Sequence, residues 1–485
     1  MITLTIGRPR LTLGLDEHQR VDHDTHVRLH GELPEITADD LVVLAELGAL
    51  RGCGGAGFPF ARKLRSVLRS AFRRRTPARV VVNAAEGEPG SAKDRMLLQR
   101  LPHLVLDGAE LAARALGASE VVVGVADRRV PGADEDPAQE SLRAAVAERR
   151  SPLVFRMVRT PHRFVSGQAG ALVQAVNGGA PIPPGEPRRA SESGVAGLPT
   201  LLSNAETFAH AALLALGGAY RYSSVGTSEQ PGTILLTVGG SVVVEAPAGT
   251  PLVQVLHMCD VSPGQAVLVG GYHGSWLAPD AVARASLSRE GMAEVGGALG
   301  AGVVLPLSGA TCPLGEVERV LRYLAGESAG QCGPCVRGLP ALAESFAALV
   351  GGGGEPESVL TAAEVGEGKG ACAHPDGSAV FARSALAVFA EDVSTHALTG
   401  GCGRPVAGEL PLTDEPADRR ARLHLDWSRC DGHGLCADLL PDLVLLDRNG
   451  YPRDRDVLVP DALVGDAELA VRMCPELALR LRARG

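Results

Sequence analysis

The stretch Arg79-Val-Val-Val-Asn83-Ala-Ala-Glu86-Gly87-Glu88-Pro89-Gly90 joins a short apolar run to an acidic turn that contains glycine and proline. A β-branched run of this length, closed by turn residues, predicts a buried strand over Arg79–Val82. A helical pattern follows at Asp94–Leu116, and a second apolar strand is expected at Glu120–Ala126. Strands that alternate with helices favour an α/β layer fold with a largely parallel sheet.

The rest of the chain divides into further segments, because 485 residues exceed the roughly 100–200 residues of one ordinary domain. Short β runs around one helix fit a small β-grasp domain, and helical patterns recur at Gly315–Leu349 and Ser378–Val393. The expected parts are an N-terminal arm at 1–40, an α/β domain at 41–230, the β-grasp domain at 231–308, a helical domain at 309–399, a linker at 400–420 and an α+β domain at 421–485.

Composition excludes several classes of function. A formal net charge of -9 argues against nonspecific binding to nucleic acid or to an anionic membrane, since both need a basic surface. No run approaches the ~20 apolar residues of a membrane span, and the start MITLTIGRPR lacks a signal-peptide pattern, so we expect a cytoplasmic protein. In that reducing compartment, the ten cysteines favour metal ligation or burial over disulfides.

The motif with the most specific spacing is Cys430-Asp-Gly-His433-Gly-Leu-Cys436, followed after 37 residues by Cys474-Pro475. A tight loop with two thiols and a distant Cys-Pro can hold an iron–sulfur cluster. The segment resembles the small bacterial ferredoxins that serve cytochromes P450. Three cysteines favour a [3Fe-4S] cluster, but His433 could instead ligate the fourth iron of a [4Fe-4S] cluster.

A second cysteine group is Cys332-Gly-Pro-Cys335 with the later Cys372. Cys-Gly-Pro-Cys at a helix start is also a redox dithiol motif. The preceding residues, Glu327-Ser-Ala329-Gly-Gln, resemble instead the cluster loop of the flavin-bearing subunit of respiratory complex I and of related NAD-linked hydrogenases and formate dehydrogenases. Ala329 stands where that family has a first cysteine, so a fourth ligand could come from Cys312, His374 or Asp376, or the cluster could be absent.

The resemblance extends from Leu41 to Ala397 and implies a flavin site, by analogy for FMN. A glycine-rich loop at Gly52–Phe58 lets backbone N–H groups approach a phosphate or flavin closely, and the helix after it presents its positive end. The family also has a β-grasp domain that binds soluble ligands. The resemblance implies FMN contacts from Gly52, Gly54, Gly55, Ala56, Gly57, Lys63, Asn83, Glu86, Gly87, Gly167, Gln168, Ser203, Asn204 and Thr207, with Glu88 beside the nicotinamide and Phe58 stacked on the dinucleotide as the catalytic pair.

Several positions depart from the family pattern. Gly167-Gln168-Ala169-Gly170 replaces a Gly-Glu-Glu-Thr segment, Ala85 replaces an aspartate and Ser203 replaces an asparagine. The family's nucleotide-clamping Lys and Phe fall near Glu186 and Arg189, while Arg188 and Arg189 could hold the 2′-phosphate of NADPH. The flavin contacts are therefore better preserved than the pyridine-nucleotide contacts.

These features predict an NAD(P)H-dependent FMN and iron–sulfur oxidoreductase of diaphorase type. Electrons would pass through the Cys332, Cys335 and Cys372 cluster to the fused ferredoxin, and on to a protein acceptor such as a cytochrome P450. One alternative is an electron-transfer subunit that no longer binds NAD(P)H and relays electrons between protein partners. Another is a degenerate binding module without redox activity.

Overall fold

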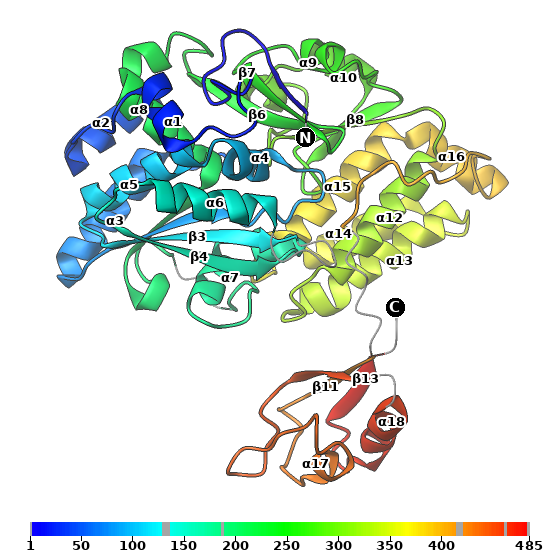
Figure 1. Cartoon of the computed structure of the whole chain (residues 1–485). Coiled ribbons are helices and arrows are strands. Elements are labelled where there is room, and N and C mark those ends of the chain that lie inside the picture. Colours follow the sequence, from blue (N-terminus) through cyan, green and yellow to red (C-terminus); the bar gives the residue numbers. More distant parts are fainter. Residues whose placement is uncertain (1, 129–135, 186–188, 414–420, 460–462, 483–485) are drawn as a thin grey trace. The chain divides into compact units, whose positions relative to one another are not determined.

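The computed structural model describes residues 2–128, 136–185, 189–413, 421–459 and 463–482 (Figure 1). Contacts divide the chain into two compact units, residues 1–412 and residues 413–485. The first unit contains two sheets and a helical region, and the second is a small α+β domain. The predicted α/β fold with a C-terminal ferredoxin-like domain is confirmed.

A four-stranded parallel sheet, in the order β4-β3-β2-β5, carries the first functional motifs. Its strands are β2 (Arg79–Ala84), β3 (Glu120–Asp127), β4 (Val154–Pro161) and β5 (Thr200–Asn204). The chain runs outward from β2 through β3 to β4 and then returns to place β5 on the other side of β2. The direction of strand order therefore reverses between β2 and β5, which is where open α/β sheets usually bind ligands.

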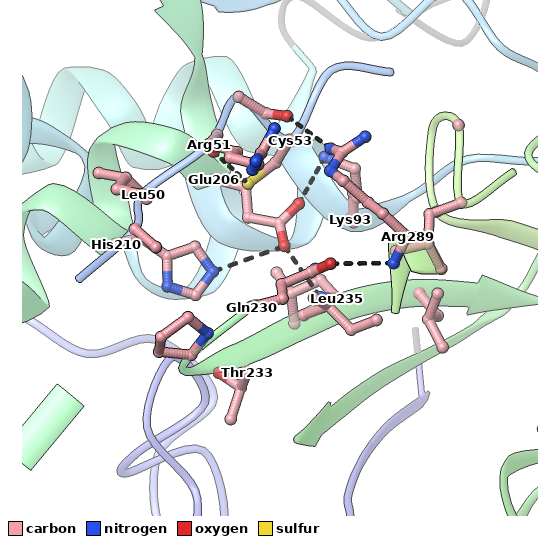
Figure 2. A pocket seen from close by; sticks show the side chains of 18 of the residues that line it. Leu50, Arg51, Cys53, Lys93, Glu206, His210, Gln230, Thr233, Leu235 and Arg289 are labelled. Atoms are coloured by element: carbon pink, nitrogen blue, oxygen red, sulfur yellow. Dashed lines mark hydrogen bonds and ion pairs between the residues drawn. The ribbon is translucent and has the colours of Figure 1, made fainter. Parts of the chain in front are cut away.

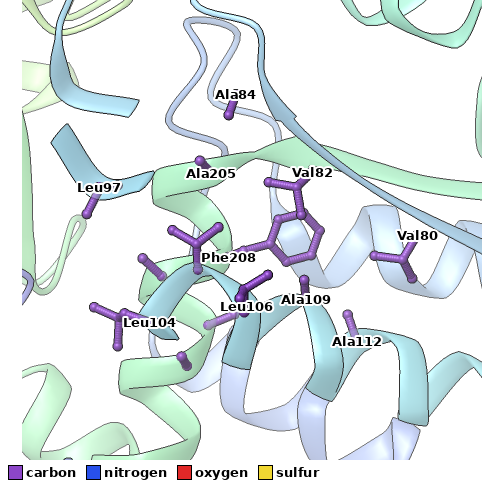
Figure 3. Close-up of a cluster of buried hydrophobic side chains, with 14 of the residues drawn as sticks. Val80, Val82, Ala84, Leu97, Leu104, Leu106, Ala109, Ala112, Ala205 and Phe208 are labelled. Carbon is purple, nitrogen blue, oxygen red and sulfur yellow. The ribbon is translucent and has the colours of Figure 1, made fainter. Parts of the chain in front are cut away.

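Both faces of this sheet are covered, because successive side chains of a strand point to opposite faces. Val80 and Val82 of β2 belong to the large core on one face, together with Phe208 (Figure 3). Val81 belongs to a smaller cluster on the other face, with Leu172. The surrounding helices are α1 (His23–His30), α2 (Ala38–Leu47), α3 (Phe60–Arg74), α4 (Lys93–Arg100), α5 (Pro102–Leu116), α6 (Pro137–Glu148), α7 (Ala169–Val176) and α8 (Ala205–Tyr222).

The expected single helix at 94–116 is two helices, α4 and α5. Pro102 lies at the first turn of α5, and a proline cannot continue a preceding helix because it lacks the N–H and clashes with the turn before it. Within α5, Gly108 lies so close to α8 that an added Cβ would be 1.8 Å from the Phe208 carbonyl oxygen. The small residue therefore allows the two helices to pack closely over β2.

The second sheet has six strands in the order β1-β7-β6-β10-β8-β9. Its strands are β1 (Ile2–Thr5), β6 (Thr233–Val238), β7 (Val242–Pro247), β8 (Ala266–Val269), β9 (Ser275–Leu277) and β10 (Val303–Leu307), with the helices α9 (Leu252–Met258), α10 (Pro279–Arg284) and α11 (Arg289–Ala293). Within the expected N-terminal arm, residues 2–5 form the strand β1, which pairs in parallel with β7. Their short alternating pattern gave no signal of the distant partner strand.

The helical region consists of α12 (Pro313–Gly326), a π-helical turn η3 (Pro334–Gly338), α13 (Leu339–Val350), α14 (Pro356–Gly366), α15 (His374–Val388) and α16 (Ala390–Thr399). Residues 401–412, which we expected to begin a linker, pack within the first unit. The buried carboxylate of Glu316 accepts hydrogen bonds from the backbone N–H groups of Gly408, Glu409 and Leu410. These bonds fix the segment on α12.

The second unit is a three-stranded antiparallel sheet in the order β12-β11-β13, with two helices. Its elements are β11 (Ala421–Leu425), α17 (Leu435–Leu439), β12 (Asp456–Val459), α18 (Val464–Met473) and β13 (Leu479–Arg482). Its own core includes Leu423, Leu440 and Leu479. No helix in the described part of the whole chain combines the length and the apolarity that crossing a bilayer requires.

Candidate functional site

The predicted flavin-site residues gather at the carboxyl edge of the parallel sheet, where β2 and β5 end. Asn83, one residue before the end of β2, and Asn204, the last residue of β5, are register partners. The Asn83 side-chain amide donates to the Gly167 carbonyl at 2.8 Å, and the Asn204 side chain caps α8 by accepting from the Glu206 N–H. Three motifs that are far apart in the sequence therefore meet at the point where the strand order reverses.

The glycine-rich loop closes over this edge and is tied to α8. The Cys53 N–H donates to the Thr207 hydroxyl at 3.0 Å, and an added Cβ on Gly54 would lie 3.4 Å from the Asn204 Cβ. Within the described residues, the backbone N–H groups of Gly54–Gly57 have no hydrogen-bond acceptor. A run of free N–H groups beside a helix start is the donor set that a phosphate or a flavin needs.

A second close approach joins the acidic turn to the loop after β4. An added Cβ on Gly87 would be 2.4 Å from the Arg163 carbonyl oxygen, and one on Gly167 would be 2.5 Å from the Ala85 carbonyl oxygen. Neither glycine leaves space for a side chain. Glycine is therefore required at both positions by backbone contact between the two loops.

The Glu86 carboxylate is held by hydrogen bonds within the protein. Its carboxylate accepts hydrogen bonds from the Ser91 hydroxyl and from the backbone N–H groups of Asp94 and Arg95, at 2.5, 3.2 and 3.3 Å. These N–H groups belong to the first turn of α4, where a negative charge is stabilising. Glu86 thus holds the start of α4. The resemblance had implied that this side chain contacts the flavin directly.

The Glu88 carboxylate, in contrast, has one oxygen with a hydrogen-bond donor and one without. One carboxylate oxygen accepts the Tyr272 N–H at 3.0 Å, while the other is buried without a partner among the described residues. Burial raises the pKa of Glu88 to about 8, although backbone N–H donors from Tyr272 and Gly90 act in the opposite direction. An unpaired buried oxygen is unfavourable in isolation, so this position suits contact with a polar ligand atom.

The remaining predicted contacts are distributed around the same edge. The Lys63 ammonium donates to the Leu202 carbonyl at 2.9 Å, and burial lowers its pKa. Ser203 is buried in β5, beside Val82 of β2. Phe58 is exposed, as stacking on a nucleotide would require, and the Arg62 guanidinium lies over one face of its ring. Of the residues near the expected nucleotide clamp, Glu186 and Arg188 lie outside the described residues.

A pocket next to the glycine-rich loop lies between α8 and the six-stranded sheet (Figure 2). Lys93 forms ion pairs with Asp94 at 2.9 Å and with Glu206 at 2.8 Å, so its charge is balanced within the protein. Glu206 also accepts the Leu235 N–H of β6. This buried network joins the two sheets of the first unit behind the loop.

Two residues from the part of the chain that carries the second sheet also reach these loops, and sequence reasoning missed both. Tyr272 reaches Glu88 from the turn between β8 and β9, where an added Cβ on Gly271 would be 2.5 Å from the Glu88 carboxylate. The Arg289 guanidinium lies against Gly57 and donates to the Gly52 carbonyl at 3.3 Å. The Gly270-Gly271 pair, with φ of +93° and +87°, was the available signal of a close backbone approach.

The cysteines of the helical region converge beside these loops. The sulfurs of Cys332 and Cys335 are 3.5 Å apart. Burial acts to raise the pKa of Cys332, but backbone N–H groups of Ala371 and Cys335 donate to its sulfur and hold its pKa below the ordinary value. Burial raises the pKa of Cys372, against hydrogen bonds from the His374 backbone and the Gln168 side chain. N–H donors to thiolate sulfur are typical of iron–sulfur sites.

The three suggested fourth ligands have other partners. Both ring nitrogens of His374 are engaged, with His273 at 3.0 Å and the Leu324 carbonyl at 2.8 Å. The Asp376 carboxylate accepts the Gly368 N–H at 2.7 Å. Cys312 lies with His396 and Cys402 in a separate group. The ligands that the structure offers this cluster are thus Cys332, Cys335 and Cys372.

In the second unit, Cys430, His433, Cys436 and Cys474 line one cavity. Gly432 and Gly434, with φ of +72° and +75°, form the tight loop that precedes α17. Cys474 ends α18, and Pro475 prevents the helix from continuing. His433 is exposed, with Nε2 3.4 Å from the Glu476 carboxylate. The loop and the distant Cys-Pro therefore meet as their spacing predicted.

Fold and sites together define a protein with an FMN-binding α/β domain, an iron–sulfur region and a C-terminal cluster domain. Residues 46–212 match the Nuo51 FMN-binding domain, residues 316–396 the NADH-ubiquinone oxidoreductase-F iron–sulfur binding region, and residues 423–481 a 4Fe-4S single cluster domain. The predicted FMN and iron–sulfur cofactors are confirmed by these matches, and the donor set described above fits them.

Similarity over about three quarters of the chain points to the same kind of protein. The chain is 27% identical to the second NADH-quinone oxidoreductase F-subunit of Rhizobium meliloti over 387 residues, which cover 76% of this chain and 91% of that protein. It is 29% identical to the NADH-quinone oxidoreductase F-subunit of Mycobacterium tuberculosis over 388 residues, covering 75% and 86%. An NAD⁺-reducing [NiFe]-hydrogenase in the H₂-reduced state superposes with a TM-score of 0.68 at 25% identity, covering 80% of this chain and 67% of that one.

Proposed function

We propose that this chain is an NAD(P)H-dependent FMN and iron–sulfur oxidoreductase that passes electrons to its own C-terminal ferredoxin domain. The observation that carries the proposal is the direct contact between the flavin-side loops and the cluster loop of the helical region. The Phe164 N–H donates to the Glu327 carboxylate at 2.7 Å, and the Gln168 side chain donates a hydrogen bond to the Cys372 sulfur. Contact of this kind allows electrons to leave a flavin through a cluster.

Each group of residues has a defined task in this proposal. The free N–H groups of the glycine-rich loop, with Lys63 and Asn83, would bind FMN, and Glu88 with the exposed Phe58 would position the nicotinamide ring. Bound FMN would accept a hydride and release single electrons, which iron–sulfur clusters require. Cys332, Cys335 and Cys372 would hold the first cluster, and Cys430, Cys436 and Cys474 the second, with His433 at the fourth corner.

The acceptor after the ferredoxin domain would be another protein, for example a cytochrome P450 or a further oxidoreductase. The curated relatives carry the name of a subunit, and the structural relative is described as an NAD⁺-reducing hydrogenase. These descriptions support our proposal that the chain exchanges electrons between a pyridine nucleotide and a protein partner.

A second candidate function is an electron relay between protein partners without NAD(P)H binding. It is favoured by the sequence Gly167-Gln168-Ala169-Gly170, which lacks the two glutamates of the related proteins. The Gln168 side chain hydrogen-bonds the Cys372 sulfur, so this segment would lie beside the first cluster. In this alternative, a reduced partner protein would reduce the flavin and neither nucleotide would.

The proposed route is tested by removing one ligand of the last cluster. We expect Cys436→Ser to reduce a small one-electron dye with NADH or NADPH at the wild-type rate, but to lose reduction of a protein acceptor such as cytochrome c by tenfold or more, since each cluster depends on its thiolates. Cys259→Ser, at the half-buried cysteine that follows helix α9, is the matched control. Equal loss of both activities would contradict the route, and so would unchanged reduction of the protein acceptor.

A further inference from the structure

Three potential metal ligands that belong to neither cluster motif lie together, at the start of α12, near the end of α16 and just after α16. The Sγ atoms of Cys312 and Cys402 and Nε2 of His396 all lie within 4.8 Å of one another. The distance from the Cys312 sulfur to His396 Nε2 is 3.5 Å. Cys312 and His396 are buried, and Cys402 is half-buried. Two thiols and one imidazole are a typical donor set for zinc.

The orientation of the histidine ring supports ligation. His396 Nδ1 is 2.7 Å from the Val350 carbonyl oxygen, at the end of α13. A carbonyl oxygen can only accept a hydrogen bond, so Nδ1 carries the proton and Nε2 presents its lone pair to the two sulfurs. Histidines that bind metals are usually fixed in this way by a hydrogen bond from the other ring nitrogen.

The backbone also holds the two cysteines together. Cys312 is the N-cap of α12, where its sulfur accepts the Gly315 N–H at 3.4 Å. The Cys312 N–H donates to the Pro405 carbonyl at 2.8 Å, three residues beyond Cys402. An added Cβ on Gly315 would lie 2.3 Å from Val406. Contacts of the surrounding backbone, in addition to the hydrogen bond to the Cys312 sulfur, therefore hold the two cysteines in place.

We propose that Cys312, His396 and Cys402 bind one zinc ion, with solvent as the fourth ligand. Binding releases the two thiol protons, so the ion and the two thiolates together carry no net charge. The site ties residues 402–406 to α12, at the end of the first unit. It does not depend on the proposed redox function, and it uses none of the ligands assigned to the iron–sulfur clusters.

The first test is the metal content and zinc coordination of the full chain, purified without oxygen and with its clusters and flavin intact. We expect about one zinc per chain in addition to the iron, and a zinc X-ray absorption spectrum with two sulfurs at about 2.3 Å and nitrogen or oxygen at about 2.0 Å. Protein with full iron and no zinc would overturn the proposal. A shell of three or four sulfurs would also overturn it, because the zinc would then occupy a cluster site.

The second test uses matched cysteine variants. Cys402→Ser should lose most of the zinc while keeping the wild-type content of iron and flavin, whereas Cys259→Ser should keep the zinc. Retention of zinc by Cys402→Ser would overturn the assignment, as would a disulfide between Cys312 and Cys402 in the oxygen-free protein, detected by mass spectrometry. If Cys402→Ser does not fold, the absorption spectrum of the unaltered chain still decides the question.

Discussion

Glu86 and Glu88 are two residues apart on the same turn, yet their surroundings differ. The Glu86 carboxylate accepts three hydrogen bonds at the start of α4, whereas Glu88 has one oxygen buried without a partner in the described part of the chain. A carboxylate that is fully bonded holds structure, and one that is incompletely bonded is free to meet a ligand. At the residue scale, this difference supports the proposal that Glu88 meets the nucleotide, whereas the Glu86 carboxylate holds the loop.

Replacing Glu88 with Gln tests this assignment through stability and rate. Because burial raises the Glu88 pKa from 4.5 to about 8, the folded protein holds a proton that the unfolded chain has lost between these values. Stability contributed by this group therefore falls as the pH rises through that window. We expect Glu88→Gln to melt above the wild type at pH 9 and together with it at pH 4.5, and to be reduced by NAD(P)H roughly 10- to 100-fold more slowly.

The control for this prediction is Glu294→Gln, at an exposed glutamate after α11. It should change neither the melting temperature at pH 9 nor the rate of reduction. A Glu88→Gln protein with wild-type rates and a wild-type pH profile would contradict the assignment of Glu88. Differential scanning calorimetry and stopped-flow absorbance provide the two measurements.

The sequence was most informative about residues within motifs. Asn83, Gly167 and Asn204 were chosen from their motifs, and the structure brings them together at one sheet edge. Tyr272 could not be found in this way, because it contacts Glu88 across 184 positions of the chain, from another sheet. A contact of that range leaves no local pattern, apart from the glycines that allow the two backbones to approach.

At the scale of elements, the site depends on loops that touch through their backbones. Gly167 has no space for a side chain, since an added Cβ would be 2.5 Å from the Ala85 carbonyl. We expect Gly167→Ala to separate the two loops, to lower the free energy of unfolding by about 1–3 kcal/mol and to reduce the FMN content of the purified protein. Flavin released by denaturation measures the occupancy.

Gly185→Ala is the matched control, because nothing lies within 4 Å of a Cβ at that position. It should retain wild-type flavin content. Full flavin in Gly167→Ala would show that the contact between the two loops does not shape the flavin site. Loss of flavin in both variants would point to a general effect on folding.

Boundaries of helices and strands can be predicted where the capping or turn residues stand next to them in the sequence. A capping box of Thr37 and Asp40 starts α2, and the short β runs expected in the β-grasp domain form strands of the second sheet. The break between α4 and α5 was missed, although Pro102 signals it, because the apolar periodicity continues across the proline. Strand β1 was missed because its partner is formed about 240 residues later.

At the scale of the whole molecule, the chain consists of two separate compact units. The cysteine motif and its resemblance led us to expect a separate C-terminal domain, and residues 413–485 form a unit with its own core. The end of the first unit was not predictable from composition. Residues 401–412 have the glycine and proline content of a linker, but Glu316 and the Cys312 N–H bind their backbone.

The central claim is that a pyridine nucleotide supplies the electrons of this chain. The most direct test is an anaerobic titration of the complete protein with NADH, and separately with NADPH, followed by visible absorbance and electron paramagnetic resonance. The account predicts that at least one nucleotide bleaches the flavin and reduces the clusters in both units. Protein with full flavin and iron that dithionite reduces, but that neither nucleotide reduces, would contradict it.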